Sequence, residues 1–245
     1  MPPPESWFVT RTMRALEALA FEPMSAPRLA ETLRVHTRTA RRLAVRLHEE
    51  GYLIRTADAH RRYSPSMRIV ALAGQVVQRA DLPRAAAPFV ERLFEHGGGP
   101  AHLMIPSYRE ALCLVHRANG TGPAHPRLGE LVPSHCTAAG KALLGHREPW
   151  RESVLAAPLA AFTPRTITDP ARLREEAELV RRRGYAVEDG EHHDGVRVVA
   201  APVFAAGDEV VAALSVTLGD GQALEELAGL VVATACELTA ELAAR

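Results

Sequence analysis

The chain has 245 residues, of which 47% are hydrophobic, enough to build one large or two ordinary domains. Its formal net charge is zero, yet residues 1–80 carry 13 Arg against 7 Asp or Glu, whereas residues 81–245 carry 16 basic against 22 acidic side chains. This split excludes an even charge distribution and favours a polyanion-binding module joined to an acidic domain.

Cysteine spacing and hydropathy limit the class of protein further. Cys113, Cys136 and Cys236 form neither a CxxC pair nor an even set, so no disulfide framework is expected, and the first two are expected to be buried thiols. No apolar run reaches the roughly 18 residues of a membrane span, and the MPPPESW start does not resemble a signal peptide. We expect a cytoplasmic protein without a membrane partner or a cofactor.

Three helical patterns open the chain, at 10–21, 25–33 and 37–48. Ser25 is the expected N-cap of the second, with Pro27 in its first turn, and Thr37 is the expected N-cap of the third. Only residues 34–36 separate the second helix from the third, which is typical of a helix-turn-helix pair. Residues 52–55, a turn at 57–60 and a returning strand at 61–63 then predict a β-hairpin wing.

The third helix separates charge from apolar surface. Winding it at 100° per residue puts Ala40, Leu43, Ala44 and Leu47 on one stripe and its arginines near the opposite side. Arg38, Arg42 and Arg46 repeat every four residues without a neutralising acid, a spacing at which like charges repel each other.

A solvated surface is the ordinary explanation of such a charged face, and a membrane-surface helix is disfavoured because the stripe lacks Trp and Phe. The winged context favours duplex DNA, with the helix in the major groove and the wing on the backbone. The predicted DNA-binding residues are Thr37, Arg38, Thr39, Arg41, Arg42 and Arg46 on the helix, and Arg61 and Arg62 on the wing.

A further helical pattern at 67–79 leads to a boundary near residue 80. We therefore expect a winged helix-turn-helix domain at 1–66, a linker helix at 67–80 and a second domain at 81–245. The second domain shows a helix at 89–96, a hairpin at 101–106 and 111–117, a loop at 119–133, and helices at 137–144, 150–156 and 170–183. Strands at 196–204 and 210–218 and a helix at 223–242 follow, so the fold class is α+β.

Several stretches resemble the IclR family of bacterial transcriptional regulators: VPSHCTAAGKALLGH (132–146), TPRTITDPARLREEAELVRRRGYAVEDGEHHDGVRVVAAPVF (163–204) and VVAALSVTLG (210–219). The N-terminal ARRLAVRLHEEGYL is similar to the family's recognition helix. The resemblance implies a winged helix-turn-helix joined to a GAF-like mixed α/β effector-binding domain. It also implies a homodimer, often assembled into a homotetramer, that binds double-stranded operator DNA and senses a small organic or aromatic acid.

The family's pocket corresponds here to Thr137, Ala138, Ala139 and Gly140, to Val196 and Val198, and to Ser215 and Thr217. A helix N-terminus at residue 137 suits a carboxylate because it offers unpaired backbone N–H groups. Met104 and Leu114 on the first hairpin are the expected apolar lining. The sequence departs from the family in having Val198 where a cysteine is frequent, and in lacking the usual glycine of the turn at 33–35.

Other groups of residues suggest metal binding or catalysis but lack the features that these functions require. His192, His193 and Asp194 beside Glu191 lack the spacing of a metal site. Ser134-His135-Cys136 has no orienting acid, and neighbours on a strand point to opposite faces. Lys141, the only lysine, is expected to reach solvent from a helix of small residues, without a catalytic role.

Two alternatives to a ligand-responsive regulator remain open. One is a small-acid-binding enzyme or carrier with an accessory basic module, and the other is a structural interaction protein. DNA affinity that falls steeply with salt would favour the regulator, and catalytic turnover would favour the enzyme. For a regulator, we expect effector binding to change the placement of two DNA-binding modules through the helix at 67–79.

Overall fold

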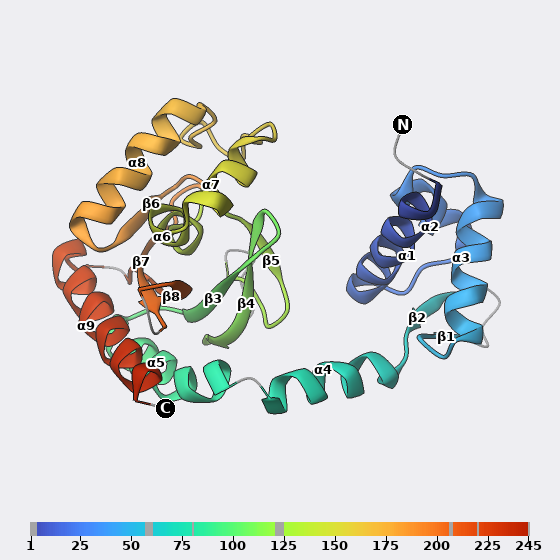
Figure 1. Cartoon of the computed structure of the whole chain (residues 1–245), viewed down its shortest axis with the longest axis horizontal. Coiled ribbons are helices and arrows are strands. Elements are labelled where there is room, and N and C mark those ends of the chain that lie inside the picture. Colours follow the sequence, from blue (N-terminus) through green and yellow to red (C-terminus); the bar gives the residue numbers. More distant parts are fainter. Residues whose placement is uncertain are drawn as a thin grey trace. The chain divides into compact units, whose positions relative to one another are not determined.

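The computed structural model describes residues 4–56, 61–79, 81–120, 125–205, 208–219 and 221–244, with the backbone alone at 4–7 and 76–79. The chain divides into two compact units, Met1–Ala80 and Asp81–Arg245 (Figure 1). Each unit has its own hydrophobic core, so each is described by itself.

The N-terminal unit contains three helices, a two-stranded hairpin and a fourth helix. These are α1 (Pro4–Phe21), α2 (Ala26–Leu33), α3 (Thr37–Glu49), β1 (Leu53–Arg55), β2 (Tyr63–Pro65) and α4 (Met67–Arg79). Leu19, Leu29, Leu47, Leu53 and Tyr63 bring α1, α2, α3 and the hairpin into one core. The winged helix-turn-helix predicted from the sequence is therefore confirmed as a fold, with α1 starting earlier than expected.

Local details of this unit differ from the predictions. The N-cap of α3 is His36, not Thr37, and the His36 side chain accepts a hydrogen bond from the backbone N–H of Arg38. Ser25 is the N-cap of α2 as expected, but its side chain makes no capping hydrogen bond. Pro65 lies inside β2, paired with Leu53 at the end of the hairpin. The predicted turn at 57–60, with Asp58, lies outside the described residues.

The missing glycine between α2 and α3 is replaced by a strained arginine. Arg34 adopts the left-handed conformation with φ of 51°, and its backbone N–H bonds the carbonyls of the last turn of α2. A glycine would adopt this conformation without the Cβ clash. The helix-turn-helix geometry is thus kept at some cost in backbone strain.

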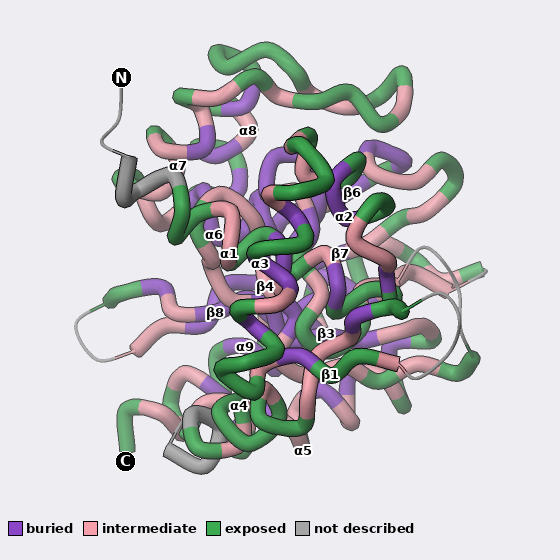
Figure 2. Tube along the Cα trace, turned by 90° about the vertical axis from the view of Figure 1, so that its right-hand side faces the viewer, coloured by how far each residue is buried: buried purple, intermediate pink, exposed green. Residues whose placement is uncertain are grey.

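Most described side chains of α4 are exposed, and its tube is mostly green in Figure 2. Its first turn is fixed to the end of α3, because the Arg68 guanidinium donates to the Glu50 carbonyl at 2.7 Å and stacks over the Tyr52 ring at 4.7 Å. The start of α4 is therefore held against the end of α3.

The C-terminal unit is built on a six-stranded antiparallel sheet in the order β5-β4-β3-β8-β7-β6. The strands are β3 (Ala101–Ser107), β4 (Glu110–Arg117), β5 (Leu131–Pro133), β6 (Ala186–Asp189), β7 (Arg197–Phe204) and β8 (Val210–Thr217). The edge strands β5 and β6 were not predicted, and β5 falls in the expected loop at 119–133. They have 3 and 4 residues, too short to show an alternating pattern.

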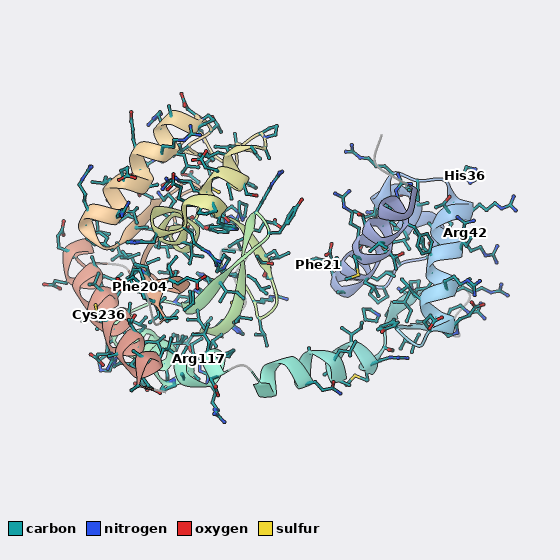
Figure 3. The ribbon with its side chains drawn as sticks, in the orientation of Figure 1. Phe21, His36, Arg42, Arg117, Phe204 and Cys236 are labelled. Atoms are coloured by element: carbon teal, nitrogen blue, oxygen red, sulfur yellow. The ribbon has the colours of Figure 1, made fainter. Side chains whose placement is uncertain are left out.

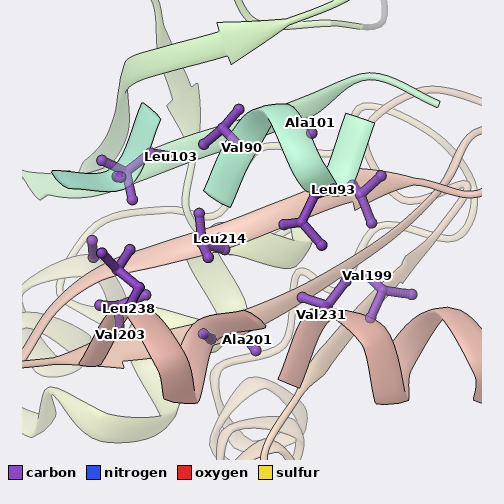
Figure 4. Close-up of a cluster of buried hydrophobic side chains, with 14 of the residues drawn as sticks. Val90, Leu93, Ala101, Leu103, Val199, Ala201, Val203, Leu214, Val231 and Leu238 are labelled. Atoms are coloured by element: carbon purple, nitrogen blue, oxygen red, sulfur yellow. The ribbon is translucent and has the colours of Figure 1, made fainter. Parts of the chain in front are cut away.

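Side chains alternate between two faces of this sheet. One face packs against α5 (Asp81–Gly97) and α9 (Leu224–Ala243), and Figure 4 shows Val90 and Val231 from these helices among side chains of the strands. The other face packs against α6 (Ala138–His146), which is covered in turn by α7 (Glu148–Leu155) and α8 (Pro170–Arg183). The mixed α+β prediction is confirmed.

Helix α5 begins at Asp81, although the sequence predicted a start at Phe89. Pro83 is tolerated because it lies in the first turn, whose N–H groups have no helical partner. Pro88 lies inside the helix, and Ala85, Ala86 and Val90 around it are buried against the sheet. Tertiary packing thus outweighs the helix-breaking tendency of a proline.

Candidate functional site

The arginines of α3 lie on the surface of the N-terminal unit. Arg38, Arg41, Arg42 and Arg46 are exposed, whereas the apolar stripe of the same helix, including Leu43 and Leu47, is buried. Figure 3 shows Arg42 extending outward from α3. Thr37 is exposed as well, and Thr39 is half-buried.

Few carboxylates reach this arginine surface. Arg46 pairs with Glu49 at 3.1 Å, but the side chains remain 70% and 52% exposed, so the pair contributes little. For Arg38, Arg41 and Arg42 no ion pair occurs within the parts of the chain that the structure describes. Their charge is therefore available to an anion from outside the molecule.

The wing brings two further arginines to the described surface. Arg61 and Arg62 are exposed, and the backbone of Arg62 exchanges hydrogen bonds with Thr56 at the end of β1. Arg61 has a positive φ of 44°. The sequence also failed to single out Arg55, which is exposed at the end of β1.

The C-terminal unit holds a pocket between its sheet and the N-terminus of α6. It contains about 540 Å³ of space not filled by atoms, part of which is open solvent. Seven predicted residues line it: Met104, Thr137, Ala138, Ala139, Val198, Ser215 and Thr217. Seven others were not predicted: His102, Pro126, Glu130, Val132, Glu188, His192 and His193.

Three predicted pocket residues lie elsewhere. Leu114 packs against the core on the opposite face of the sheet, because its neighbour Cys113 takes the α6 side. Val196 precedes β7 and closes a turn, accepting a hydrogen bond from Gly190. A Cβ on Gly140 would lie 2.2 Å from the Ser134 carbonyl oxygen, so this glycine permits close packing of α6 on the preceding turn.

The N-terminus of α6 is partly occupied by the protein's own groups. The Thr137 hydroxyl accepts from the Gly140 N–H at 3.3 Å, and a Glu188 carboxylate oxygen accepts from the Ala138 N–H at 3.4 Å. Burial raises the pKa of Glu188 to about 7, against the lowering effect of its backbone hydrogen bonds. A neutral Glu188 is therefore well populated near pH 7, and it can donate a hydrogen bond into the pocket.

Histidines supply much of the polar lining. His102, on β3, is 3% exposed, and burial, with smaller effects from His125 and His116, lowers its pKa to about 3. His192 and His193 lie on the loop after β6 with ring centroids 4.1 Å apart, and mainly burial lowers the pKa of His192 to about 4. His102 and His192 are thus neutral at pH 7, and no Lys or Arg is among the described lining residues.

The expectation that Lys141 reaches solvent is wrong. Its side chain is 2% exposed, and its Nζ bonds a Glu191 carboxylate oxygen and lies 3.5 Å from Glu176 on α8. Arg183 pairs with the same Glu176 at 3.2 Å. The reason is that the sheet covers one side of α6 and α8 the other, so residues 138–145 are all buried. A helix of small residues was the available signal for such close packing on two sides.

This buried pair anchors the loop that carries part of the pocket. In the sequence, Glu191 lies between Glu188 and the pair His192 and His193. These three neighbours line the pocket, whereas Glu191 is not among the lining residues. The hydroxyls of Thr163 and Thr166 donate to the Glu191 carbonyl, which fixes the same loop from another side. The other Glu191 carboxylate oxygen, Oε2, is buried without a partner among the described residues.

Neither group considered for catalysis or metal binding has a matching geometry. Ser134-His135-Cys136 is a turn, not a strand; the Ser134 hydroxyl donates to the Arg109 carbonyl, and His135 Nε2 lies 2.9 Å from the Ala160 carbonyl oxygen. Burial raises the pKa of Cys136, so its thiol stays protonated. Among the described residues, no cluster of three His, Cys, Asp or Glu side chains is suited to a metal ion. None of the helices searched there is long and apolar enough to cross a bilayer.

A winged helix-turn-helix joined to a separate unit with a polar pocket is typical of regulators that bind DNA and a small molecule. Residues 74–239 match the family model described as "Bacterial transcriptional regulator IclR C-terminal". The "Uncharacterized HTH-type transcriptional regulator RhmR" of Escherichia coli is 30% identical over 239 residues, which cover 94% of this chain and 91% of the relative. The chain therefore belongs to the IclR family of bacterial transcriptional regulators.

Solved structures agree in fold over nearly the whole chain. A putative IclR transcriptional regulator from a Silicibacter species superposes with a TM-score of 0.82 at 26% identity, covering 96% of each chain. An IclR homologue from Microbacterium hydrocarbonoxydans, solved in complex with 4-hydroxybenzoate, gives a TM-score of 0.79 at 26% identity and covers 97% of this chain and 100% of its own.

Proposed function

We propose that this regulator binds operator DNA through the arginines of α3 and the wing, and that a small organic acid bound in the pocket controls this binding. The observation that carries the proposal is the exposed face of α3, where Arg38, Arg41 and Arg42 have no acidic partner among the described residues. Phosphates are the anions that such a surface binds, and one or two of the arginines can reach guanine in the major groove.

A homodimer supports this function. Dimeric helix-turn-helix proteins place two recognition helices about one helical turn of DNA apart. The N-terminal unit exposes Phe8, Val9, Met13 and Phe21 on α1, and Met67 and Val70 on α4, apolar surface that a second copy would cover. Effector binding would then change the spacing of the two modules through α4.

The pocket suits an organic acid whose carboxylate binds while Glu188 carries a proton. The described lining contains Glu188 and Glu130 but no cation, so a second full negative charge would be uncompensated. A neutral Glu188 removes that conflict by donating a hydrogen bond to the carboxylate of the ligand. The 4-hydroxybenzoate bound by the Microbacterium homologue is an acid of suitable chemistry.

DNA binding is tested with the full-length protein on a duplex that the wild type selects from a random pool. The double variant Arg38→Ala, Arg42→Ala should lose at least 100-fold in affinity by fluorescence anisotropy, at about 1.4 kcal/mol per factor of ten. The control Arg84→Ala, Arg174→Ala removes the same charge from exposed positions of the C-terminal unit and should change affinity little. Selection of no duplex, or equal losses in both variants, would refute the proposal.

Sensing is tested separately by thermal shift against a panel of organic acids, because a ligand that binds only the folded state raises the melting temperature. The expected result is stabilisation by one class of acid, and release or tightening of the selected duplex by the same class. If every acid left both melting temperature and DNA affinity unchanged, the sensing function would be wrong while the DNA-binding function stood.

A further inference from the structure

One buried polar atom of a pocket residue has no hydrogen-bond partner among the residues that the structure describes. His102 Nε2 is inaccessible to solvent and makes no hydrogen bond to any described residue. His102 is one of the residues that line the pocket, and it is 3% exposed. Since an unpaired buried nitrogen is costly, a group of this kind indicates a missing hydrogen-bond partner in the pocket.

The sheet register fixes where this nitrogen lies relative to Glu188. His102 on β3 pairs with Ser215 on β8, while Thr217 on β8 pairs with Val198 on β7, and Val198 pairs with Glu188 on β6. Two strands therefore separate the strand of His102 from the strand of Glu188. At about 4.8 Å per strand, β3 and β6 lie roughly 14 Å apart across the sheet. The two polar groups thus reach the pocket from opposite sides.

The lining between these two sides is mixed. Ser215 and Thr217 provide hydroxyls, and Met104, Val132 and Val198 provide apolar surface. A ligand that fills this space and satisfies both ends has an apolar middle and a polar group at each end.

The two ends differ in the group they accept. At the Glu188 side the N-terminus of α6 favours a carboxyl group. At the His102 side the imidazole is uncharged, because burial and the neighbouring His125 and His116 hold its pKa at about 3. A neutral imidazole cannot offset a carboxylate, but it bonds a hydroxyl in either tautomer, as donor or as acceptor.

We infer that His102 binds a hydroxyl group at the far end of the effector, so that the pocket selects hydroxylated acids over the corresponding unhydroxylated acids. This inference rests on the proposed sensing function and names the ligand class of the same pocket. His102 is then the residue that determines specificity, because an acid without the hydroxyl leaves the buried Nε2 unpaired.

Matched pairs of acids test this inference on the full-length protein by isothermal titration calorimetry. The probes are 4-hydroxybenzoate with benzoate, and 4-hydroxybutyrate with butyrate. Wild-type protein should bind the hydroxylated member of at least one pair about tenfold more tightly or better. 2-Hydroxybenzoate, whose hydroxyl lies beside the carboxyl group, should gain nothing over benzoate.

The variant His102→Phe keeps a ring of similar size and removes both nitrogens. It should bind the two members of the pair about equally, chiefly through weaker binding of the hydroxylated acid, while His102→Gln should keep part of the preference. The control His116→Phe changes the histidine of β4 that pairs with His102 and does not line the pocket. Burial, the main cause of the lowered His102 pKa, still keeps His102 neutral in this variant, so the full preference should remain.

Each other outcome counts against the inference. Equal binding of both acids by wild type, or a preference that survives in His102→Phe, would mean that a buried water satisfies Nε2 and would overturn the inference while leaving acid sensing intact. No binding of any probe would overturn the ligand class. In that case the anisotropy assay on the selected duplex would show whether the DNA-binding function stands by itself.

Discussion

The two units of the molecule use cationic side chains in opposite ways. On α3 the arginines are exposed, and Arg38, Arg41 and Arg42 lack an acidic partner among the described residues. On α6 the single lysine is buried and paired with Glu191 and Glu176. An exposed unpaired charge is available to an external polyanion, whereas a buried pair holds parts of one fold together.

The same difference governs how solvent acts on each unit. Salt screens charges on the surface of a protein over about 8 to 10 Å, but it screens a buried pair much less. Loss of a surface arginine leaves no desolvated charge behind, while loss of Lys141 leaves a buried carboxylate without its cation. The predictions below test this contrast, starting with the largest expected effect.

Salt should separate the two units most clearly. If a dimer neutralises about six to ten phosphates, raising monovalent salt from about 50 to 200 mM should weaken binding to the selected duplex by about 10³ to 10⁵-fold. The melting transition of the C-terminal unit should move little over the same range. A flat salt dependence of DNA affinity, measured by anisotropy, would contradict the role of the α3 arginines.

Removing the buried cation should damage the C-terminal unit. Lys141→Met should lower its free energy of unfolding by about 3 to 5 kcal/mol, because Glu191 is left buried and unpaired. The double variant Lys141→Met, Glu191→Met should recover part of that loss, and Arg84→Met, which breaks the exposed pair with Asp81, should change stability little. Denaturant unfolding gives the free energy of unfolding of all three variants. Similar losses for Lys141→Met and Arg84→Met would contradict the difference expected between a buried and an exposed ion pair.

Glu188 should make stability depend on pH. Its pKa in the folded protein is about 7, above the usual 4.5, so the stability it contributes is full below about pH 4.5 and is lost as pH rises through 7. At about 1.4 kcal/mol per pKa unit, the free energy of unfolding of Glu188→Gln should rise by up to about 3 kcal/mol relative to that of the wild type as the pH increases from 5 to 8.

The difference between Glu188→Gln and wild type, measured by thermal unfolding across that range, isolates this group from the buried histidines, whose lowered pKa values act in the opposite direction. Glu178→Gln, at an exposed position of α8, provides the baseline. A difference that stays constant with pH would mean that Glu188 is ionised in the folded protein throughout.

The smallest effect is expected at the turn of the helix-turn-helix. Arg34→Gly should stabilise the N-terminal unit by about 1 kcal/mol, because glycine adopts a φ of 51° without the Cβ clash. Arg34→Ala keeps the Cβ and should not stabilise it. Calorimetric melting distinguishes the two, and equal effects would show that loss of the arginine charge, not backbone strain, is responsible.

Much of the fold and part of the pocket could be predicted because the signals are local. The amphipathic stripe of α3 and the boundaries of α4 and α8 follow from residues close together in the sequence. The start of α6 also follows locally, since Thr137 is its N-cap. The short edge strands β5 and β6 and the early start of α5 could not be predicted, because packing against distant elements decides them.

The pocket residues also divide into those that local sequence predicts and those that depend on tertiary structure. Thr137, Val198 and Ser215 were found through a resemblance that local sequence carries, but His102 and Glu188 belong to strands three places apart in the sheet. Leu114 was misplaced because its side of the sheet depends on the strand register.

The sequence by itself determined the helix-turn-helix, the cationic face of α3 and the family, because a side chain's position around a helix follows from its number along the chain. Only the tertiary structure decided which charges are buried and which histidines face the pocket. Burial depends on what packs from elsewhere: α8 covers Lys141, and α6 and the sheet enclose His102 and Glu188. Those contacts set the pKa values, and they leave His102 Nε2 without a partner among the described residues, the observation from which the ligand class is inferred.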